Sequence, residues 1–317
     1  MNSVLPAYQK RLSLGGVIGD AATIFRQRWR TFVGIMVAAI VPFFILLVVG
    51  VILGLFAVLS AGQSDPSQLI RSPATIISLA LGALLLAALF ALFQLAAQAA
   101  AIVVTGRALQ GEPSSIGEAF RTGLPRIASM LGAAILIAVL LMLLAAVSIP
   151  LLVLSTLGLL TLIALVVWAA NPGARRPWLK WFIILTVPFG LPIYFGTRWA
   201  LYGPAVVLER VGPSASLRLS AELTAGRWWW VFLILVAVGI ITSILQAIPG
   251  AVLGAIVAIA LRTSVSGTSA DTTAQIVNSA VSLVGWVLFG AFAYVGTTVL
   301  FALLHSQPAA EPGADQT

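Results

Sequence analysis

Long apolar stretches alternate with short polar ones along almost the whole chain. Each apolar stretch is rich in Leu, Val, Ala and Ile and nearly free of charge, and most are long enough to cross a bilayer, which takes about 20 residues of helix. A backbone in lipid must satisfy its hydrogen bonds internally, so helices are the expected structure. The apolar segments cover residues 31–59, 73–105, 127–148, 150–170, 179–208, 228–261 and 274–304. This pattern predicts an all-α integral membrane protein.

Three of the apolar segments follow amphipathic stretches of similar design. In each stretch an apolar residue is followed by an arginine, and a second arginine stands where the apolar segment begins. We interpret these stretches as helices that lie along the membrane surface before the chain turns into the bilayer. The apolar–Arg steps are Phe25–Arg26, Phe120–Arg121 and Leu217–Arg218, and the arginines at the membrane entrance are Arg30, Arg126 and Arg227.

Helical spacing shows which side of each amphipathic stretch is apolar. In the second stretch, Ser115 and Glu118 also have the spacing of an N-terminal capping box. The third stretch has the weakest pattern, with Leu219 and Leu223 as its clearest apolar pair. In the first stretch, one helical face collects Leu14, Val17, Ile18, Ala21, Phe25 and Trp29.

The three stretches predict three copies of one unit, consisting of a surface helix, a span and a return span. The second and third copies match best, because Arg126 precedes Pro150 by about the same distance as Arg227 precedes Pro249; Pro42 comes too early in the first. Chance similarity among Leu- and Ala-rich helices is the alternative. The predicted domains are a cytoplasmic N-terminus with the first surface helix (1–30), a membrane domain (31–305) with repeats at 31–105, 113–208 and 213–304, and a disordered cytoplasmic tail (306–317).

The number of crossings depends on the segment at 150–170, from Pro150 to Ala170. With the basic N-terminus on the cytoplasmic side, six and seven crossings both place twelve of the seventeen Lys and Arg residues inside and five outside, so charge does not decide. The counterpart of this segment in the third unit, residues 249–261, is too short to span; it either lies at the outer surface or continues the preceding helix beyond a kink. By analogy we expect six crossings, about six transmembrane helices, with both termini cytoplasmic.

Three tryptophans in a row follow Arg227 at the start of an apolar segment. Adjacent indoles on a helix point in three directions, which is difficult to pack in a protein core but suits the membrane interface, where each ring lies among headgroups. We therefore expect Trp228, Trp229 and Trp230 to anchor one span at the cytoplasmic interface, and Trp29 to do the same for the first.

Composition supports a membrane location and excludes several classes of function. Hydrophobic residues make up 61% of the 317 residues and charged residues 8%, against about 25% charged in soluble domains. The net charge of +8 lies mostly at the ends of apolar segments, as topology signals do, so nucleic acid is not an expected partner. The absence of cysteine excludes disulfides, thiolate nucleophiles and Cys-bound zinc. The only histidine, His305, is interpreted as an interfacial residue at the end of the last segment.

None of the nine carboxylates falls within an apolar segment, which argues against coupling to protons or sodium ions. No catalytic constellation or metal-ligand cluster is visible, so we expect no catalytic residues, no metal and no cofactor. The polar residues that lie deepest are Gln94, Gln98, Gln246 and Asn278. They either form hydrogen bonds between helices or, for the pair on one face of a helix at 94 and 98, line a polar cavity for a lipid or solute.

Arg198 lies about two helical turns inside the end of its apolar segment. Its side chain either extends to the cytoplasmic headgroups, pairs with a carboxylate of a neighbouring surface helix, or binds a lipid phosphate. The residues considered for such a headgroup-binding or ion-pairing role are Arg198, Glu209, Arg218, Glu222 and Arg227.

The stretch "RWALYGPAVVLERVGPSASLRLSAELTAGRWWWVFLI" resembles a motif of bacterial six-helix membrane proteins, namely the membrane domain attached to some glycerophosphoryl diester phosphodiesterases and its stand-alone relatives. The resemblance also covers "LGGVIGDAATIFRQRWRTFVGIMV" and "AYVGTTVLFALL", but "LLHSQPAAEP" replaces the Tyr and acidic–Arg pair with which relatives often end. The residues that carry it are Arg198, Pro204, Glu209, Gly212, Gly226, Arg227 and Trp228.

What the resemblance implies is a fold and a location, the bacterial cytoplasmic membrane. In that family the phosphodiesterase activity belongs to a separate soluble barrel with its own His and carboxylate cluster, and this chain has neither the room nor the residues for one. The resemblance suggests lipid-associated work only by association.

The sequence therefore predicts a non-catalytic multi-pass inner-membrane protein with a lipid-associated binding, scaffolding or membrane-homeostasis role. Membrane phospholipids are its expected partners, and other membrane proteins are a second kind of candidate. The alternative is a transporter or permease component that moves a lipid or small solute between the repeats. An intramembrane enzyme using Arg198 and Glu209 is a third hypothesis. A water-filled cavity open to one side would favour transport, and a lipid-filled groove beside Arg198 would favour lipid binding.

Overall fold

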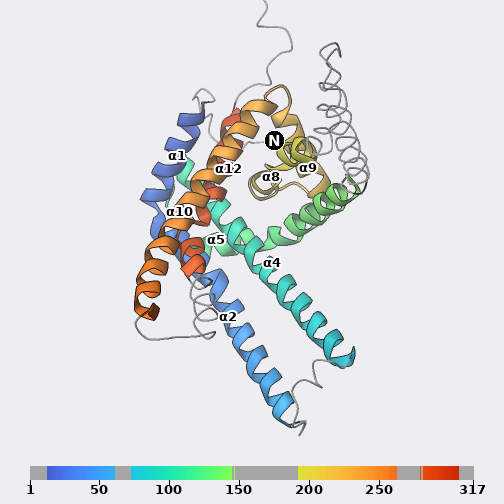
Figure 1. The fold of residues 1–317 in the computed structure, drawn as a ribbon. Helices are drawn as coiled ribbons and strands as arrows, with labels where there is room; N and C mark the ends of the chain where they lie inside the picture. Colours follow the sequence, from blue (N-terminus) through green and yellow to red (C-terminus); the bar gives the residue numbers. More distant parts are fainter. Residues whose placement is uncertain are drawn as a thin grey trace, which may run out of the picture.

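The computed structural model describes residues 13–60, 73–144, 146, 192–262, 279 and 281–306. In this part of the chain all regular structure is helical, as predicted, and no strand occurs (Figure 1). Residues 127–144, 192–199 and 281–289 are also helical. The main elements are α1 (Leu14–Gln27), α2 (Trp29–Ser60), α4 (Pro73–Leu109), α5 (Ile116–Gly123), the 3₁₀ turn η1 (Leu124–Arg126), α8 (Tyr202–Leu208), α9 (Pro213–Thr224), α10 (Trp228–Arg262) and α12 (Ala291–Ser306).

Five helices of the described part are long and apolar enough to cross a membrane, which is consistent with a multi-pass membrane protein. They overlap five of the predicted crossings, but the third begins at Ile116 and so includes residues that were predicted to lie along the membrane surface. The remaining predicted crossing, 179–208, is described only from residue 192 onward. The segment at 150–170, Asn278 and the tail beyond Ser306 lie outside the described residues. The five helices are Trp29–Gly50, Ile76–Leu109, Ile116–Leu144, Trp228–Pro249 and Val281–Ser306.

Large apolar side chains cover the surface of the long helices. Figure 1 shows α2 and the first half of α4 extending together away from the other helices. In this region Ile45 is 59% exposed, Leu84 67% and Leu85 62%. A continuous apolar surface of this kind is unfavourable in water, whereas a bilayer supplies acyl chains to cover it.

The second half of α4 forms the centre of the helix packing. Its small residues, with Ala97, Ala100 and Ala101 among them, are completely buried. Short side chains allow neighbouring backbones to approach closely, and α4 contacts α2, α5, α8 and α12. At Gly123 of α5, an added Cβ would stand 3.1 Å from the backbone carbon of Ala99 on α4.

The first amphipathic stretch forms α1, which begins at the N-cap Ser13, whose hydroxyl accepts a hydrogen bond from the Gly16 N–H at 3.1 Å. Its apolar face is buried inside the protein, at Val17 and Ala21, and packs against α12. Phe25 continues this face into a ring cluster with Phe32, Phe289 and Phe292, at centroid distances of 5.6–6.2 Å. The centre of the predicted apolar face is therefore confirmed, but Leu14 is exposed, the buried Ile24 was not predicted, and the main contacts of the face are with other helices of the chain.

The second and third amphipathic stretches form α5 with η1, and α9. Ser115 caps α5 by accepting a hydrogen bond from the Glu118 N–H at 3.3 Å, the first half of the predicted capping box. The expectation for α9 was incomplete. Leu219 and Leu223 are partly buried, and the face that α9 buries is formed by Ser216, Leu217, Ser220 and Thr224.

Two long helices contain a proline without ending there. Pro42 lies inside α2, and Pro249 lies inside α10, which continues to Arg262. Residues 249–261 thus extend the preceding helix, one of the two arrangements predicted for them. Neighbouring groups can satisfy the carbonyl that a proline leaves without a donor, so such helices are tolerated in membranes. Each amphipathic helix is followed directly by a long apolar helix, namely α2, the helix at 127–144, or α10.

Candidate functional site

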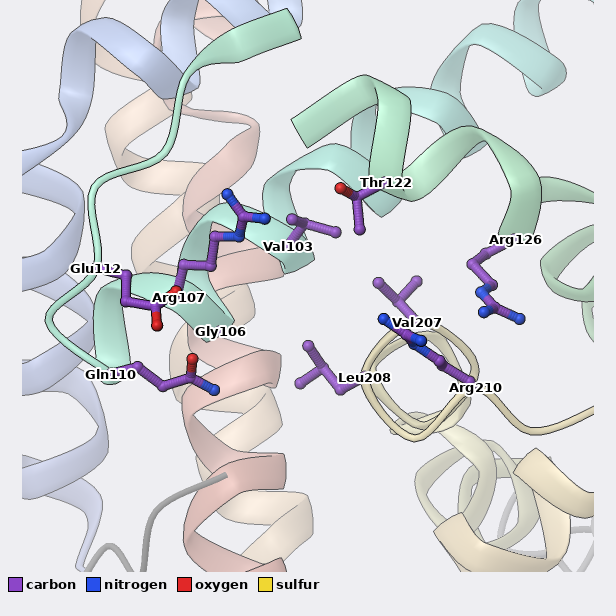
Figure 2. A pocket seen from close by; sticks show the side chains of 10 residues that line it. All are labelled: Val103, Gly106, Arg107, Gln110, Glu112, Thr122, Arg126, Val207, Leu208 and Arg210. Carbon is purple, nitrogen blue, oxygen red and sulfur yellow. The ribbon is translucent and has the colours of Figure 1, made fainter. Parts of the chain in front are cut away.

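A hollow of about 240 Å³ lies where the end of α4, the turn η1 and the end of α8 meet (Figure 2). We call it the basic hollow because three of the residues lining it are arginines. It lies at the polar end of the candidate span Ile76–Leu109, and Thr122 and Arg126, which also line it, belong to the candidate span Ile116–Leu144. The lining residues are Val103, Gly106, Arg107, Gln110, Glu112, Thr122, Arg126, Val207, Leu208 and Arg210.

One wall of the basic hollow is built by the end of α4 and the loop after it. The N–H groups of Gln110 and Glu112 donate to the carbonyl oxygen of Arg107 at 3.0 and 2.9 Å, which closes the helix end. Gly111 makes this possible because its φ of +75° is a left-handed conformation that glycine adopts without strain. Figure 2 shows Arg107, Gln110 and Glu112 together on this wall.

The same wall is held by two arginine contacts. The guanidinium of Arg107 forms an ion pair with the carboxylate of Glu118 on α5 at 2.5 Å; the two side chains are 27% and 48% exposed. Nη2 of Arg28, between α1 and α2, donates to the backbone carbonyl of Glu112 at 2.6 Å. These contacts fix the loop after α4 to α5 and to the α1–α2 junction.

The opposite wall carries Arg126 at the end of η1 and Arg210 just after α8 (Figure 2). In the described part of the chain, neither side chain has a carboxylate within ion-pair distance. Arg210 has a φ of +56°, the only positive φ at a non-glycine residue in the described ranges, and this conformation is uncommon for such residues. Two arginines without a counter-charge on one wall form an arrangement suited to binding an anion.

Glu209, beside the basic hollow, is paired with the only histidine. Nε2 of His305 lies 3.6 Å from Oε1 of Glu209, with side chains 25% and 12% exposed, and the His305 ring stacks on Phe301 at 5.7 Å. Oε1 of Glu209 is buried and forms no hydrogen bond within the described part. The interpretation of His305 as a simple interfacial residue was therefore incomplete, because it joins the end of α12 to the loop after α8.

Arg198 contacts Tyr194 on its own helix. Nη1 donates to the Tyr194 hydroxyl at 3.2 Å, and the guanidinium carbon lies 5.7 Å from the ring centroid. The hydroxyl of Ser220 on α9 donates to the Arg198 carbonyl at 2.7 Å and accepts from the Leu201 N–H at 3.2 Å. The backbone at Arg198 and Leu201 thus holds α9 through the Ser220 hydroxyl. The structure does not pair the guanidinium with the carboxylate of Glu209, whose partner is His305.

The other members of the predicted headgroup set lie on or beside α9. Arg218 and Glu222 form an exposed i,i+4 ion pair at 2.8 Å, with side chains 83% and 58% exposed. Pairs of this kind add little stability because water screens both charges. Arg227 is half-buried, and its N–H donates to the Thr224 carbonyl at 3.2 Å. None of these three residues lines the basic hollow.

Three of the four tryptophans predicted as anchors are exposed at the protein surface. Trp29 is 48% exposed, Trp229 67% and Trp230 53%. Trp228 is half-buried, its indole N–H donates to the Tyr194 carbonyl at 3.2 Å, and its ring stacks on Phe232 at 5.3 Å. Trp228 therefore packs within the chain, while Trp229 and Trp230 face outward.

The deep glutamines take part in helix packing. The Tyr294 hydroxyl donates to Oε1 of Gln94 at 3.5 Å, a long hydrogen bond between α12 and α4. The cavity beside Gln94 measures about 10 Å³, about enough for one water molecule and far too small for a lipid. Gln98 stands close to Gly203 on α8, and Gln246 lies at the close approach of α10 to Gly285. In the described part, these contacts favour interhelical packing over a lipid-sized cavity at Gln94.

The sequence did not single out the basic hollow. Arg107, Arg126 and Arg210 were recognised only as basic residues at the ends of apolar segments. That position was the one available signal, because nothing in the spacing of these arginines along the chain shows that they meet. No group of His and acidic residues able to hold a metal ion occurs in the described ranges.

Comparisons with known proteins give no relative for this chain: no protein-family model, no curated protein and no solved structure matches it. The resemblance to the phosphodiesterase membrane domain is therefore still a prediction.

Proposed function

We propose that the chain is a non-catalytic multi-pass membrane protein that associates with phospholipids in a binding, scaffolding or membrane-homeostasis role. The observation that carries the proposal is the basic hollow, where Arg126 and Arg210, which have no carboxylate partner in the described part, lie beside the polar end of the candidate span Ile76–Leu109. Such ends belong at the level of the lipid headgroups, where arginine side chains meet phosphate groups.

The proposed architecture has six crossings in three units of a surface helix and two spans, with both termini in the cytoplasm. The order of α1, α5 and α9, each followed by a long apolar helix, supports the repeat. On this arrangement the basic hollow faces the cytoplasmic leaflet, whose anionic lipids attract basic residues. The resemblance to the bacterial phosphodiesterase membrane domain supports a location in the bacterial cytoplasmic membrane.

The surface of the long helices also supports close contact with lipid. Exposed apolar side chains lie along α2 up to Ile52 and along the first half of α4 where its side chains are described, and Trp229 and Trp230 face outward at the start of α10. Lipid acyl chains would contact the first surface, and headgroups would surround the second. No catalytic step is part of this proposal.

Native mass spectrometry of the full chain, extracted from its membrane in mild detergent, tests this function. We expect phospholipid to remain bound after purification. A chain that retains no phospholipid, and takes up none when lipid is added back, would show that the proposed function is wrong.

A further inference from the structure

We propose that the basic hollow is a phosphate-binding site in which Arg126 and Arg210 contact the phosphate group of an anionic ligand. The phosphate belongs either to a lipid headgroup or to a free phosphate compound, since both present the same oxygens. The lipid form of this inference rests on the proposed function. The site itself rests on the geometry of the hollow.

The charges on the two walls of the hollow favour an anionic ligand. Arg107 is neutralised by Glu118, and Glu112 supplies a carboxylate on the same wall. Arg126 and Arg210 stand on the other wall without a carboxylate partner in the described part. Two like charges gathered on one wall repel each other, and a bound anion removes this repulsion.

The chemistry of the arginine side chain points to phosphate. A guanidinium presents several N–H donors in a fixed plane and binds phosphate oxygens through two parallel hydrogen bonds. Arg126 and Arg210 come from different elements, η1 and the loop after α8, and stand on the same side of the hollow (Figure 2). The Thr122 hydroxyl also lines the hollow and supplies a further hydrogen-bond donor.

The conformation of Arg210 fits a binding role. Its left-handed φ of +56° is disfavoured for a residue with a Cβ, so the surrounding structure must hold it in place. The residue before it, Glu209, is held by His305, and Val207 is buried. The chain that leads into Arg210 is thus held in place, and Arg210 itself is exposed.

The size and lining of the hollow limit the ligand further. About 240 Å³ is below the usual range for sites that enclose a whole drug-sized molecule, about 300–1,000 Å³, and suits a phosphate with a few attached atoms. Val103, Val207 and Leu208 supply an apolar portion of the lining. A phosphate ester fits this combination, with its oxygens at the arginines and its carbon atoms against the apolar side chains.

Binding to the purified full chain tests the site in two arms. In the first, native mass spectrometry measures retention of added phosphatidylglycerol and phosphatidylcholine. In the second, calorimetry measures binding of inorganic phosphate and glycerol 3-phosphate in detergent. The variants are Arg126→Gln, Arg210→Gln and their combination, and the matched control is Arg121→Gln, which removes an exposed arginine of α5 outside the hollow.

We expect each hollow variant to weaken binding about tenfold, because one charge-assisted hydrogen bond corresponds to roughly that factor. The control should bind like the wild type, and Glu112→Gln should bind more tightly because it removes the opposing carboxylate. If the hollow variants lose phospholipid binding, the ligand is a lipid headgroup. If they lose binding of inorganic phosphate or glycerol 3-phosphate, the ligand is a free phosphate compound. Arg126→Lys and Arg210→Lys keep the charge, so weakened binding with an unchanged unfolding temperature excludes simple misfolding.

Two results would overturn the inference. If the double variant binds both classes of ligand as the wild type does, or loses no more than Arg121→Gln, the hollow is not the phosphate site. If the wild type retains phospholipid but the hollow variants retain it equally and also bind the soluble phosphates equally, this inference fails while the proposed function stands. If the wild type retains no phospholipid but binds glycerol 3-phosphate through the two arginines, the proposed function fails while the site stands.

Discussion

Arg107 near the end of α4 forms an ion pair with Glu118 of α5 at 2.5 Å, and this contact joins two helices that border the basic hollow. The pair lies beside the N-cap of α5, where Ser115 accepts a hydrogen bond from the Glu118 N–H. Glu118 therefore takes part in capping α5 through its backbone N–H and joins α5 to α4 through its carboxylate. The position of η1 and Arg126, which follow α5 directly, depends on this attachment.

Replacement of Glu118 by Gln should loosen α5, because the charged contact to Arg107 is lost while the hydrogen bond from the backbone N–H to Ser115 remains. We expect faster hydrogen–deuterium exchange for the amides of residues 116–123 and unchanged exchange in α10. Glu222→Gln, which breaks an exposed pair within α9, is the matched control. Equal exchange of α5 in the wild type and in Glu118→Gln would contradict a fastening role for the ion pair.

Two glycines of α5 should respond oppositely to the same substitution. A Cβ at Gly123 would stand 3.1 Å from the backbone carbon and the Cβ of Ala99, whereas a Cβ at Gly117 would meet nothing within 4 Å. We expect Gly123→Ala to lower the free energy of unfolding by about 1–3 kcal/mol through overpacking. Gly117→Ala should raise it by up to about 1 kcal/mol because alanine favours the helix. Thermal unfolding in detergent measures both, and similar effects of the two changes would disprove the close approach of α5 to α4.

Removal of the His305 side chain should leave the carboxylate of Glu209 without a partner in a site where that side chain is 12% exposed. We expect His305→Ala to lower the free energy of unfolding by about 1 kcal/mol, a value reduced for the partial exposure of His305. His305→Gln keeps a hydrogen-bond donor and should lose less. If His305→Ala unfolds at the same temperature as the wild type, the contact between α12 and the loop after α8 has no structural role.

The long helices could be predicted from the sequence because length and apolarity alone determine them. Residues 31–59 and 228–261 correspond closely to α2 and α10, and the prolines inside them do not end either helix. The cores of these segments needed no knowledge of tertiary contacts, since every backbone group in lipid must be satisfied within its own helix. The ends were less certain; α4, for example, continues past residue 105 to Leu109.

The buried face of α9 was only partly predicted, because the sequence pointed to Leu219 and Leu223, whereas the face that is fully buried contains serines and a threonine. Ser216 and Thr224 satisfy their hydroxyls locally, by donating to the carbonyls of Pro213 and Ser220 at 2.7 and 3.0 Å. A hydroxyl satisfied in this way can be buried at little cost. Ser220 goes further and joins α9 to the break before α8. Such contacts depend on packing that periodicity does not reveal.

The candidate site escaped sequence reasoning for a related reason. Arg198 stood out because it lies inside an apolar segment, and it proved to contact Tyr194 one turn away. Arg107 and Arg126 stand at opposite ends of one polar break and Arg210 lies in another, and only the packing of α4, η1 and α8 brings the three to one hollow. In the sequence alone, an arginine at a helix end cannot be distinguished from a topology signal, because its neighbours in space are not visible.

The chain contains no cysteine, so its orientation can be tested with one introduced thiol. Arg121 is exposed on α5, next to the basic hollow but outside its lining. A membrane-impermeant maleimide should leave Arg121→Cys unlabelled in intact bacterial cells and label it after the membrane is permeabilised, because the proposed topology puts this surface in the cytoplasm. Labelling in intact cells would reverse the proposed orientation.

The most direct test of lipid binding at the basic hollow is photo-crosslinking with a phospholipid that carries a reactive group on its headgroup. After irradiation of the full chain in membranes, peptide mapping locates the attached lipid. Crosslinks should concentrate on residues 103–126 and 207–210, and Arg126→Gln together with Arg210→Gln should reduce them strongly. Crosslinks spread evenly over the ends of all spans, and unchanged in the double variant, would contradict a defined lipid site at this position.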